Sequence, residues 1–203
     1  MWWVRQWAAP SPWRSLRQPR LVRSLSLACT WAEGDGRFLH TLESWISLAY
    51  RVPIEERYRH MLYPWLFTPE FFAKKENVEL AFQRSMADPY QTKAEAIDRQ
   101  GRGIMAWNGT RLAKLGGVRV PTLVLVGRDD ILTPPAFSRQ VARAIRRARL
   151  VVMPGGHGFF LEHADQFNRT LLRFPEVGPL DVALGPANAL GDGGRRLNVS
   201  RGT

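Results

Sequence analysis

Two short, continuous apolar runs in the second half of the chain constrain its fold most strongly. They are Thr122–Val126 (TLVLV) and Leu150–Met153 (LVVM). Runs of this length without polar alternation are typical of strands buried on both faces of a parallel sheet. The segment between them, Pro135–Arg147, carries apolar residues at helical spacing, namely Phe137, Val141, Ala144 and Ile145. A strand, a helix and a second strand predict a βαβ unit, and therefore an α/β fold with a parallel sheet.

Each predicted strand is followed by a side chain that can take part in proton transfer. Asp130 comes shortly after the first run, and His157 follows the second within the sequence PGGHG. Because the carboxyl ends of adjacent parallel strands meet at one edge of a sheet, we expect the two side chains to lie together. A carboxylate beside an imidazole fixes the tautomer of the ring and stabilises the imidazolium formed during proton transfer. Taken singly, Asp130 is also compatible with a turn residue and His157 with a surface loop.

The order and spacing of these residues resemble the closing part of the α/β-hydrolase family. Residues 118–174 read as strand-G-x-x-D-x-x-x-P-P, helix, strand-P-G-x-H-x-x-x-x-E, helix. By this resemblance Asp130, three residues after Gly127, is the acid of a Ser–His–Asp triad, and Asp129 only stabilises the turn. His157 is then the base of the triad. The sequence is most similar to esterases and 3-oxoadipate enol-lactonase-like enzymes, which implies hydrolysis of an ester or lactone without a cofactor.

The resemblance extends upstream and divides the chain into five parts. Leu21–Ala28 alternates like a buried strand and resembles the strand that follows the nucleophile helix of the family. We therefore predict a partial α/β-hydrolase sheet made of the last three strands, with a helical cap inserted between the first and second of them. The predicted parts are an aberrant or disordered segment 1–20, a core strand segment 21–32, a cap 33–115, a C-terminal core 116–175 and a disordered tail 176–203.

Four helices are predicted in the cap and one after the second strand of the βαβ unit. The first carries an apolar face of Phe38, Leu42, Trp45, Ile46 and Ala49, and the second one of Tyr58, Leu62, Trp65 and Leu66. The third begins at Thr68 as N-cap with Pro69 at the first helical position, continues to Met86 and ends before Pro89. The fourth covers Thr92–Trp107 and is weakened by Gly101 and Gly103; the closing helix is Ala164–Phe174.

The aromatic side chains of the predicted cap are candidates for substrate binding. Trp45, Trp65, Phe72 and Trp107 are expected to line an apolar pocket. The alternative is that these aromatic residues, which lie at helical spacing, simply pack in the core.

No nucleophile elbow of the form G-x-S-x-G occurs in the 203 residues. Ser11, Ser15, Ser24 and Ser26 lack the strand-to-helix context that an elbow needs, and Cys29 is expected to be a buried thiol at a strand end. The resemblance therefore supplies two of the three triad residues. The alternatives to an active hydrolase are an inactive remnant and a domain that binds a small molecule in the cap. Haloperoxidases, dehalogenases and C–C bond hydrolases also share this acid and base.

The first residues suggest where an elbow is encoded. Trp and Met each have one codon, so MWWVRQWAA is compatible, in a shifted frame, with V-V-G-x-S-M-G-G. We therefore expect a frameshift near Arg14–Leu16, which resequencing the locus tests: an uninterrupted frame without this serine contradicts it. An alternative is that residues 1–25, rich in Arg and without acidic residues, form a targeting segment, visible as a cleaved N-terminus in mass spectrometry.

Composition limits the expected partners. The net charge is +11, but no recognisable nucleic-acid module accompanies the basic residues. No apolar run approaches the roughly 20 residues of a membrane span. Cys29 is the single cysteine, and His40, His60, His157 and His163 lack metal-ligand spacing. We expect a cytoplasmic protein that acts on a small ester or lactone, with no metal, cofactor, nucleic acid or membrane partner. The oligomeric state is not predicted.

Overall fold

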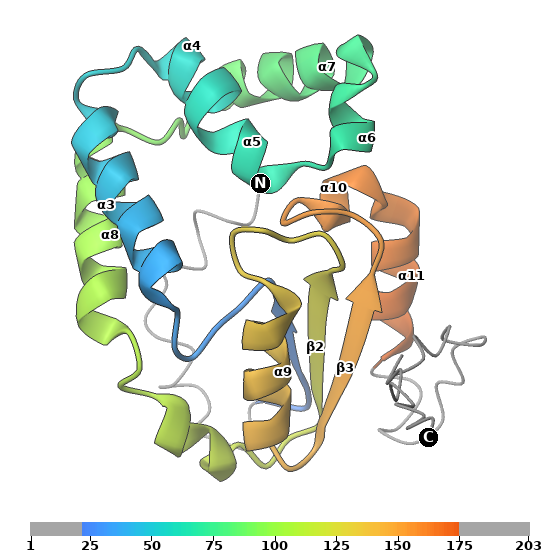
Figure 1. Ribbon diagram of the computed structural model, residues 1–203. Helices are drawn as coiled ribbons and strands as arrows, with labels where there is room; N and C mark the ends of the chain where they lie inside the picture. The colour runs from blue at the N-terminus through green and yellow to red at the C-terminus, as the bar shows by residue number, and fades with distance from the viewer. Residues whose placement is uncertain (1–21, 175–203) are drawn as a thin grey trace, which may run out of the picture.

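The computed structural model describes residues 22–174, in which three parallel strands form one sheet (Figure 1). The strands are β1 (Leu25–Ala28), β2 (Thr122–Gly127) and β3 (Ala148–Met153), in the order β1-β2-β3. Leu25 is in register with Thr122, and Thr122 with Ala148. The predicted α/β class, the last-three-strand sheet and the helical insertion between β1 and β2 are confirmed.

The first strand is shorter than predicted. It begins at Leu25, whose N–H donates to the carbonyl of Pro121 at 2.9 Å. Residues before Leu25 would have to pair with residues before Thr122, where Pro121 has no N–H to give. The strand predicted from Leu21 therefore starts where its partner can first pair; Leu21 itself lies outside the described residues.

The two faces of β2 contact different helices. Leu123 and Leu125 pack in one apolar cluster with Phe159 and Phe174, on the side of α10 (Phe159–Glu162) and α11 (Ala164–Arg173). Val124 packs on the opposite side in a cluster with Val141 and Ile145 at α9 (Pro135–Ala144). All six residues of β2 are buried, which explains why its sequence is continuously apolar.

Helix α9 ends earlier than the predicted Arg147. Ile145 leaves the helix with an extended backbone (φ −106°, ψ 112°), and β3 begins at Ala148. Ile145 is 2% exposed and belongs to the cluster of Val124. The apolar side chain of Ile145 fits the apolar face of a helix by its spacing. In the structure, Ile145 instead lies in the connection between α9 and β3, and its side chain packs in the core from there.

Helices fill the segment between β1 and β2, in agreement with the predicted cap. They are α3 (Gly36–Ala49), α4 (Ile54–Glu56), the π-helix η1 (Arg57–Leu62), α5 (Tyr63–Leu66), α6 (Pro69–Phe72), α7 (Lys75–Met86), α8 (Ala94–Trp107) and the 3-10 helix η2 (Leu112–Gly117). Figure 1 shows α5 and α6 beyond the carboxyl ends of the strands, with α3 and α8 side by side. Gly101 permits this contact, because a Cβ there would lie 2.6 Å from Ile46 Cδ1. The exact domain boundaries stay a prediction.

Two predicted cap helices have irregular backbones. The third is interrupted after Phe72, because Lys74 is extended (φ −107°, ψ 99°), so α6 and α7 are separate helices. The second contains the π-helix η1, in which Tyr63 N–H donates to the carbonyl of Tyr58. Pro64 follows at once, and a wider turn avoids the clash between a proline ring and the carbonyl four residues earlier.

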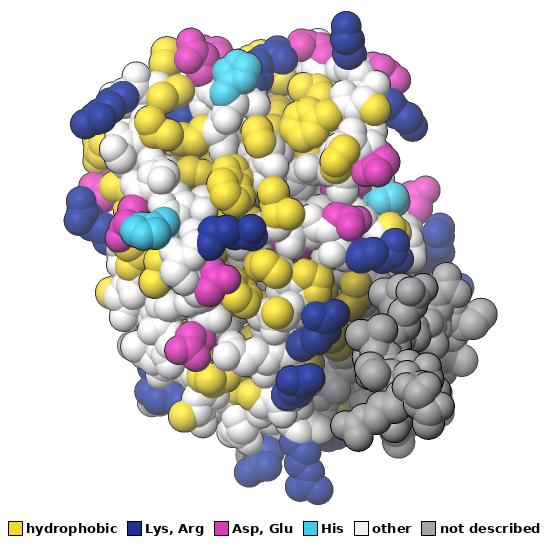
Figure 2. Space-filling view, viewed as in Figure 1, with side chains coloured by type: hydrophobic (Ala, Val, Ile, Leu, Met, Phe, Trp, Pro, Cys, Tyr) yellow, Lys and Arg dark blue, Asp and Glu magenta, His cyan; other side chains and the backbone are white. Residues whose placement is uncertain are grey.

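The visible surface carries mixed charge. Figure 2 shows Lys and Arg side chains at the margin and in the middle of this face, with Asp and Glu interspersed and apolar side chains between them. A membrane-spanning helix, which needs about 20 apolar residues, does not occur between residues 22 and 174.

Candidate functional site

The acid of the predicted pair lies in a buried loop after β2. Asp130 is 3% exposed, and its Oδ1 accepts the N–H groups of Leu132 and Thr133 at 2.9 and 2.8 Å. This local Asx-type turn explains why an aspartate folds inward here. Asp129, by contrast, is exposed, and its N–H donates to the carbonyl of Gly155 at 3.0 Å. The structure therefore places Asp130, rather than Asp129, at the site.

The base lies in the loop after β3, beside the acid. His157 is 2% exposed, and its Nδ1 lies 2.9 Å from Asp130 Oδ2. Two glycines make this approach possible. Gly155 has a φ of +104°, and a Cβ on Gly127 would lie 2.0 Å from the carbonyl oxygen of Gly156. Because a carboxylate accepts hydrogen bonds, we assign the proton of this bond to Nδ1.

Thr133 completes the hydrogen bonding of the acid. Its hydroxyl donates to Asp130 Oδ2 at 2.9 Å, lies 3.0 Å from His157 Nδ1, and the residue is fully buried. The sequence analysis did not select this residue. The spacing D-x-x-T, which places a hydroxyl within reach of the preceding carboxylate, was the available signal.

The single cysteine of the chain also lies at this site, as a thiol rather than a thiolate. Cys29 adopts a left-handed backbone (φ 48°) directly after β1, and its Sγ donates to the carbonyl oxygen of His157 at 3.1 Å. Burial raises the pKa of the Cys29 thiol well above its ordinary value, and the negative charge of Asp130 adds to the shift. A protonated thiol is a poor nucleophile, in line with the predicted structural role.

Donor atoms of Cys29, Asp130 and His157 lie within 4.8 Å of one another, close enough to be tested as a metal site. A metal needs the cysteine as thiolate, whereas its pKa is raised. Both oxygens of Asp130 already accept hydrogen bonds from the protein. The donor set therefore fits an acid–base pair better than a metal, and the absence of a metal stays a prediction.

Glu162, part of the predicted P-G-x-H-x-x-x-x-E pattern, connects the histidine loop to the helical segment. Its Oε1 accepts the N–H of Gly156 at 2.8 Å, and its Oε2 accepts the N–H of Thr68 at 3.2 Å and the Thr68 hydroxyl. The N-cap predicted at Thr68 is confirmed, since its side chain accepts from Phe71 N–H. The contact between Thr68 and Glu162 was not predicted, because the two residues are far apart in sequence.

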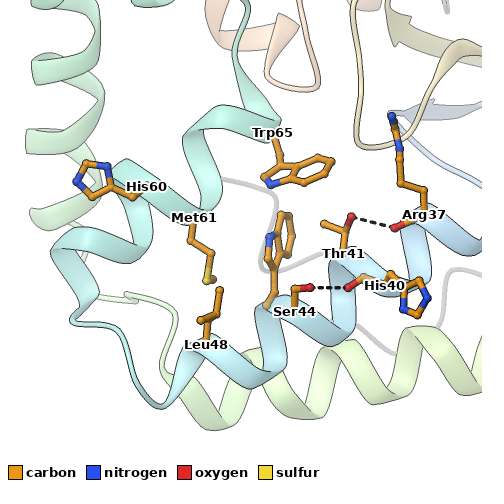
Figure 3. A pocket seen from close by; sticks show the side chains of 9 residues that line it. Arg37, His40, Thr41, Ser44, Leu48, His60, Met61 and Trp65 are labelled. Atoms are coloured by element: carbon orange, nitrogen blue, oxygen red, sulfur yellow. Dashed lines mark hydrogen bonds between the residues drawn. The ribbon is translucent and has the colours of Figure 1, made fainter.

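An open surface pocket of about 270 Å³ lies between α3 and the η1–α5 helices (Figure 3). Trp45 and Trp65, two of the four predicted substrate-binding residues, line it together with Arg37, His40, Thr41, Ser44, Leu48, His60 and Met61. The Thr41 and Ser44 hydroxyls donate to carbonyls of their own helix. Aromatic, apolar and basic groups therefore characterise the wall. The Arg37 guanidinium also donates to the carbonyl of Ile131, so this wall borders the loop of Asp130.

The other two predicted substrate-binding residues lie elsewhere. Trp107 packs edge-to-face against Trp31, with ring centroids 6.2 Å apart, in an apolar cluster that includes Phe38 and Leu132. Phe72 is half-buried and contacts Phe71 edge-to-face. The alternative stated above, packing in the core, describes Trp107, and Trp45 and Trp65 pack against the same cluster. Contact with a substrate stays a prediction for all four residues.

Comparison with known proteins agrees with this geometry. The model of the "Alpha/beta hydrolase family" matches residues 6–170. "Putative carbamate hydrolase RutD" of Azorhizobium caulinodans is 29% identical over 163 residues, covering 79% of this chain and 59% of the relative. "AB hydrolase superfamily protein YisY" of Bacillus subtilis is 30% identical over 106 residues, which are 52% of this chain and 38% of that protein.

Solved structures show the same fold. The enol-lactonase of Burkholderia xenovorans superposes with a TM-score of 0.67 at 23% identity, over 80% of this chain and 59% of that one. A hydrolase of Pseudomonas aeruginosa gives a TM-score of 0.68 at 24% identity, over 81% and 60%. The chain spans about three fifths of the length of these proteins. From its family match and its fold, the chain belongs to the alpha/beta hydrolase family.

Proposed function

We propose that Asp130 and His157 are the acid and base of a serine-dependent hydrolase that acts on esters, lactones or carbamates. The observation that carries this proposal is the buried 2.9 Å contact between Asp130 Oδ2 and His157 Nδ1, at the carboxyl ends of neighbouring parallel strands. The names of relatives and neighbours support the substrate class, since they include carbamate hydrolase and enol-lactonase. All three substrate types carry a carbonyl carbon that reacts through a tetrahedral intermediate.

The chemistry follows from the tautomer that Asp130 imposes. Nε2 of His157 takes the proton of a serine hydroxyl as the serine oxygen attacks the carbonyl carbon, and then gives this proton to the leaving oxygen or nitrogen. A water molecule then releases the acyl group by the same steps. Asp130 remains ionised and stabilises the imidazolium throughout.

The serine is the part of this proposal that the chain itself does not supply. No G-x-S-x-G elbow occurs in the 203 residues, so the activity of the whole enzyme rests on a serine outside this sequence. On its own, the pair can only activate water toward a reactive ester.

Hydrolysis of p-nitrophenyl acetate by the purified chain tests the proposal. We expect a slow rate that disappears in His157→Ala. His163→Ala is the matched control, because His163 is an exposed histidine at the end of α10, whereas the ring bonded to Asp130 is that of His157. A rate that is unchanged in His157→Ala contradicts the proposed role of the pair.

A second candidate function is the binding of a small molecule without turnover. The pocket lined by Trp45 and Trp65 favours it, because this pocket is present in the 203 residues whatever supplies the serine. Titration with 2-naphthyl acetate, followed by tryptophan fluorescence, is expected to quench the wild type and to have a smaller effect on Trp65→Ala. Saturable binding without His157-dependent hydrolysis favours this second function.

The proposed substrate is a small molecule, and we propose no nucleic-acid or membrane partner. A cytoplasmic location is proposed from the single cysteine, since a chain with one cysteine forms no internal disulfide.

A further inference from the structure

The backbone around His157 is held at three consecutive residues by three different parts of the molecule. Gly156 N–H donates to Glu162 at 2.8 Å, and Gly158 N–H donates to the carbonyl of Leu66 at 2.6 Å. The carbonyl of His157 itself accepts from Cys29 Sγ at 3.1 Å. Asp130 orients the ring, but these three bonds fix the chain that carries the ring.

Two of the three bonds lead to the same short stretch of the helical segment. Leu66 is the last residue of α5, and Thr68, the second partner of Glu162, is the N-cap of α6. Residues 66–68 are therefore bonded to the histidine loop on both sides of His157, directly at Gly158 and through Glu162 at Gly156.

Close packing makes this junction stiff. A Cβ on Gly156 would lie 2.8 Å from the carbonyl oxygen of Leu66, and one on Gly158 would lie 2.8 Å from Cε1 of Phe67. Phe67 and Thr68 are 7% and 6% exposed. Because there is so little free space between them, we expect residues 66–68 and the histidine loop to move together.

We propose that Glu162 and Thr68 are positioning residues, which lock the loop of His157 to residues 66–68 and so let the helical segment set the place of the base. The role as base rests on the proposed function, whereas the lock itself does not. Trp65, which lines the 270 Å³ pocket, directly precedes Leu66. Trp65, which lines the pocket, and residues 66–68, which are bonded to the histidine loop, are thus consecutive in the chain.

The carboxylate of Glu162 suits this role because it accepts three hydrogen bonds at once. A glutamine at this position keeps one accepting oxygen and its amide nitrogen cannot accept, so the bond from Gly156 and the bonds from Thr68 can no longer form together. Thr68→Val removes the hydroxyl at nearly constant shape, and with it both the bond to Glu162 and the N-cap bond from Phe71 N–H, whereas Thr68→Ser restores both. These variants separate the hydrogen bonds from the packing.

Amide hydrogen exchange in the ¹⁵N-labelled full chain tests the lock without any assay of activity. In Glu162→Gln and Thr68→Val, we expect exchange at both Gly156 and Gly158 to become about tenfold faster, the effect of losing one charge-assisted hydrogen bond. The low-field Nδ1–H resonance of His157 should broaden in the same variants. Thr68→Ser should behave like the wild type. Glu79→Gln, which changes an exposed glutamate of α7, is the control and should change neither signal.

The response of Gly158 decides the outcome, because Gly158 is bonded to Leu66 and not to Glu162. Faster exchange at Gly156 alone makes Glu162 a local partner and overturns the proposal, as does an unchanged spectrum. Faster exchange throughout the chain shows general destabilisation and also overturns it. Ester turnover that is unchanged in His157→Ala, in a chain that still gives the expected exchange pattern, refutes the proposed function but keeps the lock.

Discussion

The sheet region (residues 118–174) and the helical region (residues 36–117) each contain a pair of ionisable side chains at the same distance. Asp130 and His157 meet at 2.9 Å, and so do Glu79 and Arg59. Side-chain exposure is 0% and 2% in the first pair, but 50% and 33% in the second. Equal geometry therefore has unequal consequences, because water competes for the exposed pair and screens it, whereas the buried pair depends on the protein alone.

The apolar side chains show the same contrast. Every residue of β2 is buried, while α7 contains no buried residue. The proposed chemistry is thus fixed to a densely packed sheet, whereas α7 lies at the surface of the helical region. The following predictions test this difference.

Removal of the buried acid should have the largest effect. Asp130→Ala leaves the N–H groups of Leu132, Thr133 and the His157 ring without their acceptor inside the protein. We expect the free energy of unfolding to fall by about 3–5 kcal/mol, measured by urea unfolding with tryptophan fluorescence.

The exposed pair provides the comparison for this prediction. Hydrogen bonding to Arg59 lowers the pKa of Glu79, yet Glu79→Ala should leave the urea midpoint at pH 7 unchanged. Equal losses in Asp130→Ala and Glu79→Ala would show that burial does not decide the strength of these pairs.

Truncation of one leucine in each region should lower the free energy of unfolding by different amounts. Leu125 of β2 is fully buried on the side of α10 and α11, whereas Leu80 in α7 is 47% exposed. Leu125→Ala should destabilise the chain by about 3 kcal/mol through the cavity it leaves. Leu80→Ala should stay within about 0.5 kcal/mol of the wild type in the same urea titration. A large loss at Leu80 would mean that α7 is covered by another surface in solution.

The same contrast explains how much of the fold the sequence predicts. A continuous apolar run such as Thr122–Val126 fits a strand buried on both faces, and the parallel order then places Asp130 beside His157. In the helical region, periodicity predicts helices but not their interruptions. Phe71, Phe72, Val78 and Phe82 fit one helix, whereas the extended backbone of Lys74 divides it.

The parts of the site that escaped prediction depend on loops. The hydroxyl of Thr133 reaches Asp130 only because the chain turns between them, and Glu162 meets Thr68 across 94 positions of sequence. The left-handed backbone of Cys29 is also set by neighbours from other elements rather than by local preference. Patterns in a single sequence reveal periodicity and short spacings, but they do not reveal contacts between residues that are distant in the sequence.

Hydroxyl groups offer a finer test of the two regions. Thr133 donates to Asp130 and is fully buried, whereas Thr110 donates to the carbonyl of Trp107 at 2.7 Å and is exposed. Thr133→Val should cost about 1.5 kcal/mol of unfolding free energy, because a charged acceptor loses a donor. Thr133→Ser should recover most of this loss, and Thr110→Val should stay within about 0.5 kcal/mol of the wild type. If Thr133→Ser is as unstable as Thr133→Val, the methyl group and not the hydroxyl matters at this position.

The smallest expected difference between the two regions is in how the free energy of unfolding depends on pH. It follows from one raised pKa in each region. Burial raises the pKa of Cys29 at the sheet above its ordinary 9.0, and it raises the pKa of Tyr63 in the helical region above its ordinary 10.0. In both cases the folded chain holds its proton longer than the unfolded chain, so the stability each contributes is present at low pH and is lost as the pH rises. Between pH 7 and about pH 9 the thiol of the unfolded chain begins to ionise, while a tyrosine does not.

The free energy of unfolding should therefore fall over this interval in the wild type and fall less steeply in Cys29→Ala, as followed by urea titration at each pH. Equal slopes in the two proteins would mean that the thiol ionises as readily in the folded site as in the unfolded chain, and that the sheet region does not shield the groups around His157 as strongly as its burial indicates.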